Sequence, residues 1–255
     1  MDISAHVAFV TGGGSGLGAA TARYLSKAGA IVAVVDRDKK AAEAVASDCG
    51  GLAVVADVTD RASVQSAFDT VCHDLGSAPR IVVNCAGIGN AARIVDRDGN
   101  LSLDLFERII RVNLLGTYTV LSFAARAMAK LPTLNEDGER GVIINTASVA
   151  WQDGQIGQTA YAASKGGIAS LTLPAARELA RDGIRVATIA PGLFETAMTE
   201  GLRDDIRAAL ASNIPFPQRL GHPEEYARAV ESIVCNPMIN GTIIRLDGAV
   251  RLTPR

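Results

Sequence analysis

The chain has 255 residues, of which 48% are apolar, 20% charged and 4% aromatic, and its formal net charge is -2. This length suits one domain and leaves little room for a second, and the near-neutral charge argues against nucleic-acid binding as the main role. Four cysteines and three histidines lack the spacing of a zinc site or a disulfide framework, so we expect no metal and a reducing compartment.

The first residues, MDISAHVAFV, have an acidic side chain at position 2 and no basic segment of the kind that opens a signal peptide. The longest stretch without Asp, Glu, Lys or Arg, residues 3–22, contains five glycines and would make a poor membrane helix. We therefore expect a soluble, cytoplasmic protein that does not bind membranes.

Short β-branched runs alternate with alanine-rich segments of helical length along the chain. Because the runs are apolar throughout, both of their faces should be buried, as in a parallel sheet covered by helices. The pattern predicts an α/β fold, a single doubly wound Rossmann-type domain over 1–255 with a seven-stranded parallel sheet and helices on both faces. The expected strands are 6–11, 30–36, 52–56, 81–84, 141–148, 183–191 and 242–248, the expected helices are 16–28, 60–74, 104–130 and 158–181, and two charged surface insertions are expected at 90–100 and 132–140.

The first expected strand leads directly into TGGGSGLG at 11–18, followed by a helical pattern. Glycines let the backbone turn tightly and approach a pyrophosphate, which the N-terminus of the following helix attracts. The spacing differs from both G-x-G-x-x-G and the lysine-containing phosphate loop, and a glycine-rich turn without a ligand is the alternative. The loop residues expected to contact a dinucleotide are Gly12, Ser15, Gly16, Leu17 and Gly18.

Asp36 ends the second expected strand, where a carboxylate can accept hydrogen bonds from both hydroxyls of an adenosine ribose. A 2'-phosphate would be repelled there, which favours NAD over NADP. Arg37 follows and is the residue that could bind that phosphate instead. Asp36 could also serve as the N-cap of a helix, a role compatible with ribose binding.

Small or polar residues follow the next two expected strands. Because the carboxyl ends of parallel strands meet at one edge of the sheet, where ligands bind, we expect them to border the same cofactor. These residues are Asp57 and Val58 on the adenine side, then Asn84, Cys85, Ala86 and Gly87. Plain turns at the strand ends are the alternative.

Tyr161 and Lys165 are four residues apart in an expected helix and so share one face. A fixed ammonium near a phenol favours the phenolate and would lower the pKa of Tyr161, which makes acid–base catalysis possible. Such pairs are common on ordinary helices, but Ser148, at the end of the fifth expected strand, belongs to the same sheet edge.

In this order, TGGGSGLG, NCAG, RVNLLG, Ser148, YAASK and PGLFET resemble the signature set of the short-chain dehydrogenase/reductase family over essentially the whole chain. The resemblance implies that Tyr161 exchanges a proton with the substrate oxygen and that Ser148 hydrogen-bonds that oxygen. It implies that Lys165 holds the nicotinamide ribose and lowers the pKa of Tyr161, and that Asn113 anchors a water. It also implies nicotinamide contacts from Pro191, Gly192, Phe194 and Thr196.

A narrower resemblance, to a subfamily of 3-hydroxyacyl-CoA dehydrogenases, rests on strings such as GQIGQTAYAASKGGI and PFPQRLGHPEEYA. It implies that Gln155 helps hold the substrate, that the substrate is an acyl-CoA of fatty acid metabolism, and that the protein is a homotetramer. Arg93 and Arg97 could meet CoA phosphates or be solvated surface. Alternative functions are oxidation of another secondary alcohol, such as a steroid or aryl carbinol, a non-catalytic scaffold subunit of a tRNA-processing complex, and a dinucleotide-sensing regulator.

The segment 193–220 mixes apolar residues with glycine and proline and is expected to be a lid over the substrate. Its apolar surface is expected to come from Phe194, Met198, Leu202, Ile214 and Phe216. The alternative is that Leu202, Ile206 and Leu210 form the inner stripe of a packed helix.

Overall fold

A single parallel sheet organises the part of the chain that the computed structural model describes, residues 1–196 and 203–254. Its seven strands follow the order β3-β2-β1-β4-β5-β6-β7. The strands β1 to β3 are added toward one edge of the sheet and β4 to β7 toward the other, so the winding changes side between β1 and β4. The strands are β1 (Val7–Thr11), β2 (Ile31–Asp36), β3 (Leu52–Val55), β4 (Ile81–Asn84), β5 (Gly141–Thr146), β6 (Ile184–Pro191) and β7 (Ile243–Leu246). The doubly wound fold expected from the sequence is thereby confirmed.

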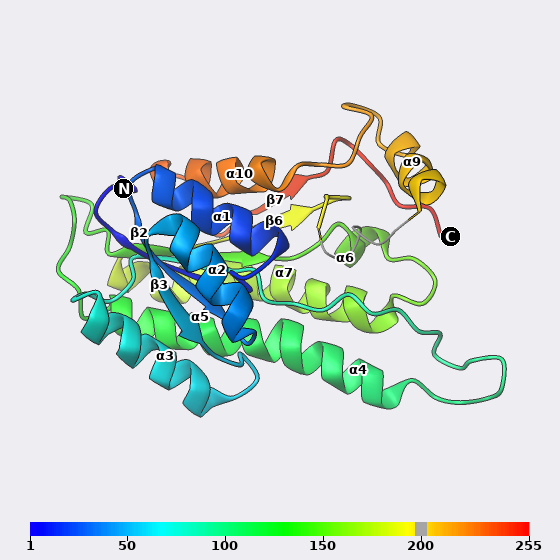
Figure 1. Cartoon of the computed structure of the whole chain (residues 1–255), viewed down its shortest axis with the longest axis horizontal. Coiled ribbons are helices and arrows are strands. Elements are labelled where there is room, and N and C mark those ends of the chain that lie inside the picture. Colours follow the sequence, from blue (N-terminus) through cyan, green and yellow to red (C-terminus); the bar gives the residue numbers. More distant parts are fainter. Residues whose placement is uncertain (197–202, 255) are drawn as a thin grey trace.

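Helices cover both faces of the sheet (Figure 1). One face carries α1 (Gly16–Lys27), α2 (Lys39–Cys49) and α10 (Pro223–Cys235). The other face carries α3 (Arg61–Asp74), α5 (Gly116–Met128) and α7 (Thr159–Leu179), with α4 (Leu103–Ile109) leading into α5. The short α6 (Ala150–Asp153) and α9 (Asp204–Ser212) lie beyond the carboxyl ends of the strands.

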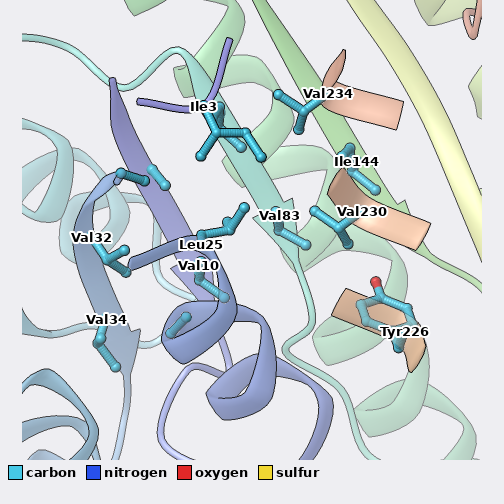
Figure 2. Close-up of a cluster of buried hydrophobic side chains, with 14 of the residues drawn as sticks. Ile3, Val10, Leu25, Val32, Val34, Val83, Ile144, Tyr226, Val230 and Val234 are labelled. Atoms are coloured by element: carbon cyan, nitrogen blue, oxygen red, sulfur yellow. The ribbon is translucent and has the colours of Figure 1, made fainter. Parts of the chain in front are cut away.

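The core consists of two apolar layers, one on each face of the sheet. Residues of β1 alternate between them, because successive side chains of a strand point to opposite faces. Figure 2 shows the layer beneath α1 and α10, where Val10, Leu25, Val83, Ile144 and Val230 are fully buried. Burying each such side chain contributes about 1.5–3 kcal/mol.

Two of the longer helices, α2 and α10, were not among the expected ones, although both begin with readable caps. Asp38 accepts a hydrogen bond from the backbone of Ala41 at the start of α2. In α10, Pro223 occupies the first turn, and the Glu225 side chain accepts from the backbone N–H of His222. Caps of this kind satisfy the free N–H groups of a first turn.

The expected helix 104–130 is divided by a π-helix, η1 (Ile110–Leu115), between α4 and α5. At the start of α5, Gly116 packs against Val58, and a Cβ there would lie 2.7 Å from a Val58 methyl carbon. One-turn π segments of this kind are frequent at functional sites.

The expected surface insertion 132–140 is wrong in part, because Glu139 is buried and forms an ion pair with Arg185 at 2.9 Å. That guanidinium also donates hydrogen bonds to backbone carbonyls at the end of α10. The end of the insertion at Glu139 is therefore packed into the fold at the amino ends of the strands, opposite their carboxyl ends.

Within 1–196 and 203–254, no helix is both long and apolar enough to cross a bilayer. The same residues contain no group of three or more His, Cys, Asp or Glu side chains that could hold a metal ion. All four cysteines are free thiols.

Candidate active site

A cavity of about 830 Å³ opens at the carboxyl ends of β1, β2, β4, β5 and β6. Nearly all the residues that the sequence predicted for a site line this cavity, although they come from seven regions of the chain. They are Gly12, Ser15, Gly16, Leu17, Gly18, Asp36, Asp57, Val58, Cys85, Ala86, Gly87, Ser148, Gln155, Tyr161, Lys165, Pro191, Gly192, Phe194 and Thr196.

The glycine loop leaves no space for side chains where it folds back on itself. A Cβ on Gly18 would lie 2.1 Å from the carbonyl oxygen of Gly12, and one on Gly12 would lie 2.8 Å from the backbone nitrogen of Ala86. Gly12 and Gly16 have positive φ angles of 61° and 49°. The loop is therefore shaped by close backbone contacts that glycine alone permits.

The first turn of α1 faces the cavity with free backbone donors. Its N-cap, Ser15, makes no side-chain capping bond, and no acidic residue lies in the first turn. A helix N-terminus in this state carries partial positive charge and directs N–H groups at a bound anion. The cradle and the donors fit the pyrophosphate of a dinucleotide.

Asp36 connects the end of β2 to the glycine loop. One carboxylate oxygen accepts from the Gly14 backbone N–H at 3.0 Å, and the other accepts from that of Asp38 at 3.0 Å. The N-cap of α2 is Asp38, so Asp36 does not cap that helix. Each oxygen keeps a further lone pair for a ribose hydroxyl.

Two residues expected at the site lie outside the cavity wall. Asn84 is buried at the end of β4, and its amide donates to the side-chain oxygen of Asn145 on β5 at 2.9 Å. Asn84 therefore does not line the cavity, and the cofactor contact expected for it stays a prediction. Its side chain ties two strands together, since a polar side chain buried at a strand pair needs a partner there.

Asn113, in the π-helix, is fully buried behind the cavity, and its side-chain hydrogen bonds are made within the protein. Its oxygen accepts from the Ile88 N–H at 2.8 Å, and its amide donates to the Ile88 carbonyl and to the Ser164 hydroxyl, both at 3.0 Å. These bonds fix the backbone of Ile88 and so the neighbouring Gly87, which lies close to Lys165. A Cβ on Gly87 would lie 3.7 Å from the Lys165 ammonium.

Ser148 and Tyr161 face the same part of the cavity from different elements. Ser148 lies two residues beyond the end of β5, so the expected strand 141–148 was too long, and Tyr161 lies in the first turn of α7. Burial raises the pKa of the Tyr161 phenol, and a hydrogen bond with Ser148 acts in the opposite direction. The sequence predicted a lowered pKa for Tyr161, but in the ligand-free protein burial has the larger effect and the pKa is raised.

Lys165 lies one turn further along α7 and is 5% exposed. Its ammonium donates to the Thr146 carbonyl at 2.7 Å and lies 5.7 Å from the centre of the Tyr161 ring. Burial lowers the pKa of Lys165 from 10.5 to about 8, and the nearby Cys85 thiol has the opposite, smaller effect. At neutral pH the cavity therefore holds a buried cation without an acidic partner.

We expect Lys165→Met to stabilise the ligand-free protein at pH 7 by about 2 kcal/mol, because the buried charge disappears and only one hydrogen bond to Thr146 is lost. A lowered pKa in the folded chain means that the penalty is complete below pH 8 and vanishes as the pH rises to 10.5. Urea unfolding at pH 7 and pH 10 measures this. A less stable variant at pH 7 would contradict the expectation.

Several residues of the cavity wall were not expected from the sequence. Arg108 and Arg111 lie one turn apart on α4 and η1, Thr146 ends β5, and Leu252 comes from the C-terminal segment. The spacing of the two arginines just before Asn113 was readable, whereas nothing local indicates Leu252. Arg93 and Arg97 line a separate cavity of about 300 Å³ in the expected insertion 90–100.

Gln155 lines the cavity beside the C-terminal segment. Its side-chain amide donates to the Thr253 carbonyl at 3.0 Å, and its backbone N–H donates to the Gln158 side chain at 3.1 Å. The Ile156 backbone donates to the Pro254 carbonyl at 3.0 Å. The segment 252–254 is therefore attached to the wall that carries Gln155.

In the expected lid, Phe194 is buried and lines the cavity, whereas Ile214 is buried in a small core with Leu220 and Val250. Phe216 is 83% exposed. In α9, Leu210 packs against that small core, and Ile206 is 42% exposed. Met198 and Leu202 lie outside the described residues. The two ends of the segment are joined by a parallel bridge between Phe194 and Gly221.

A family model described as short chain dehydrogenase matches residues 6–207. The chain belongs to this family and is an oxidoreductase acting on CH–OH groups. The 3-hydroxyacyl-CoA dehydrogenases type-2 of Drosophila melanogaster and Homo sapiens are each 47% identical to it, over 97% of this chain and 98% and 96% of theirs. The crystal structure of 3-hydroxyacyl-CoA dehydrogenase type-2 from Mycobacterium avium matches with a TM-score of 0.92 and 41% identity, covering 100% of this chain and 98% of that one.

Proposed function

We propose that the protein is an NAD-dependent dehydrogenase that interconverts (S)-3-hydroxyacyl-CoA and 3-oxoacyl-CoA. The observation that carries the proposal is the convergence of Ser148, Tyr161 and Lys165 on the same cavity as the glycine loop. The printed names of full-length relatives support the acyl-CoA substrate.

The residues that would hold NAD follow the cavity wall. The loop Gly12–Gly18 and the first turn of α1 would bind the pyrophosphate, and Asp36 would bind the adenosine ribose. Val58 would contact the adenine, and the segment from Pro191 to Thr196 would border the nicotinamide. When bound, the nicotinamide supplies or accepts the hydride.

Tyr161 would move the proton of the reaction, with Ser148 holding the substrate oxygen. In the reductive direction the phenol donates, so the burial that raises the pKa of Tyr161 keeps it in the required form. In the oxidative direction the phenolate accepts, and Lys165 would favour it by its charge. Oxidation should therefore gain from rising pH, and reduction should not.

Turnover of acetoacetyl-CoA with NADH tests the substrate. We expect its kcat/KM to exceed that of a steroid ketone or an aryl ketone by about 100-fold, because the 3-oxoacyl and CoA parts would both contribute binding energy to the transition state. Equal rates with the small ketones would favour the other secondary-alcohol substrates. Binding of tRNA at physiological salt without ketone turnover would favour the scaffold role.

We also propose that 193–220 orders over the bound substrate. Limited proteolysis between Leu193 and Leu220 should slow at least about fivefold when NADH and acetoacetyl-CoA are both present, because loops that close over ligands are cleaved in their open state. Cleavage within 90–100 serves as the control and should not change. Equal cleavage of 193–220 with and without the ligands would mean that it is not a lid.

Exposed apolar side chains on α4, α5 and α7, including Leu103, Phe106 and Tyr118, support the proposal of a homotetramer. Sedimentation equilibrium tests it directly. Cytoplasmic location stays a prediction of the sequence.

A further inference from the structure

Tyr226, on α10, is a fully buried tyrosine that the proposed chemistry does not use. Its ring belongs to the apolar layer beneath α1 and α10, one turn along the helix from Val230 (Figure 2). Its hydroxyl lies 2.7 Å from the Thr146 hydroxyl and 3.7 Å from the Cys85 sulfur. A buried hydroxyl with such partners fixes whatever it contacts.

Which of the two hydroxyls, Thr146 or Tyr226, donates to the other follows from the single proton that each carries. The Thr146 hydroxyl lies 2.6 Å from the Asn84 carbonyl, which can only accept, so Thr146 donates its one proton there. The Tyr226 hydroxyl must therefore donate to Thr146. Burial keeps the pKa of Tyr226 well above 10, so this donor is present at every working pH.

Thr146 connects the two helical layers at the sheet edge. Its hydroxyl meets Tyr226 from α10 on one face, and its carbonyl accepts from the ammonium of Lys165, which comes from α7 on the other face. The pairing of β5 with β4 ends one residue earlier, at Asn145, so at Thr146 the sheet holds the strand only from the β6 side, through Ile189. The position of the Thr146 carbonyl is thus set by its side-chain contacts as well as by the sheet.

We propose that Tyr226 is a positioning residue for the reaction, which holds Lys165 in place through Thr146. The inference rests on the proposed role of Lys165. Without the Tyr226 hydroxyl, Thr146 loses one donor and is held only by β6 and by the Asn84 carbonyl, so its own carbonyl is fixed less firmly and the Lys165 ammonium takes up alternative positions. Turnover falls because a misplaced catalytic group is penalised, while substrate binding elsewhere in the cavity is unchanged.

Tyr226→Phe tests this, because it removes the hydroxyl and keeps the ring. We expect kcat to fall about threefold to tenfold, the value of one neutral hydrogen bond, with KM for acetoacetyl-CoA within twofold. The Kd for NADH, measured by quenching of the single tryptophan, Trp151, should rise about threefold. This second measurement needs no substrate, so it decides the inference even if the acyl-CoA proposal fails.

Tyr24→Phe is the matched control, because the Tyr24 hydroxyl also holds α10, through Glu231 at 2.5 Å, but does not contact Thr146. Its kcat and NADH affinity should be those of the wild type. Equal losses of kcat and NADH affinity in Tyr24→Phe and Tyr226→Phe would mean that both variants act by destabilising the packing of α10, and would overturn the proposal.

Thr146 supplies the second test. Thr146→Val should lower kcat and NADH affinity at least as much as Tyr226→Phe, because it also removes the bond to the Asn84 carbonyl, and Thr146→Ser should retain activity. Adding Tyr226→Phe to Thr146→Val should lower them no further. In a Lys165→Met background, Tyr226→Phe should leave the residual kcat unchanged. Additive losses in either combination, or wild-type kcat and NADH affinity in Tyr226→Phe, would overturn the inference.

Discussion

Tyr161→Phe should lower kcat for acetoacetyl-CoA reduction by about 100-fold or more while NADH still binds with an affinity within about threefold of the wild type. The substitution keeps the ring that packs beside Lys165 and removes only the proton that the reaction exchanges. Stopped-flow absorbance of NADH gives kcat, and quenching of Trp151 gives the affinity.

The matched control is Tyr24→Phe, since Tyr24 lies on α1, hydrogen-bonds Glu231 and does not line the cavity. It should leave both measurements unchanged. If Tyr161→Phe retained more than a third of wild-type turnover, Tyr161 would not be the proton donor, and the pH dependence proposed for the two directions would lose its basis.

The second large effect concerns cofactor choice: kcat/KM should favour NAD over NADP by at least about 100-fold, or roughly 3 kcal/mol. Asp36 would face a 2'-phosphate with a carboxylate held by the Gly14 and Asp38 N–H groups, so it could not turn away. Asp36→Ala should narrow the preference mainly by weakening NAD, because Arg37 also lines the cavity.

Asp60→Ala is the control for this change of charge. Asp60 caps α3 and does not line the cavity, so its loss should affect stability but not the ratio of NAD to NADP use. Equal use of both cofactors by the wild-type protein would contradict the assignment of Asp36, whatever the variants did.

The site could be predicted from the sequence where its residues occupy strand ends or share a short helical spacing. Ser148 is of this kind because ligands bind at the carboxyl ends of parallel strands. Tyr161 and Lys165 are of this kind because residues four apart share one face of a helix. For Asn84 the sequence could not distinguish two roles, because a position at a strand end is the same for a ligand contact and for a bond between strands. In the structure the Asn84 side chain donates a hydrogen bond to Asn145 on the neighbouring strand.

The remaining parts depend on contacts between distant segments. Thr146 and Tyr226 are 80 residues apart, and Leu252 reaches the cavity only because the C-terminal segment binds the wall at Gln155. The raised pKa of Tyr161 depends on how completely the fold buries the phenol, which a four-residue spacing does not encode. The helices α2 and α10 could have been found, because Asp38 and Pro223 mark where they begin.

The bridge between Phe194 and Gly221 has a consequence for how this enzyme can change. A Cβ on Gly221 would lie 2.7 Å from the Phe194 ring, and beyond the bridge His222 contacts Glu195 at 3.3 Å, so both ends of the intervening segment are held side by side. A connection whose ends are already fixed can be lengthened at small entropic cost, about 0.6 kcal/mol for each doubling. In its proposed role over the substrate, this connection can therefore change in length and sequence while the dinucleotide half of the fold keeps its geometry.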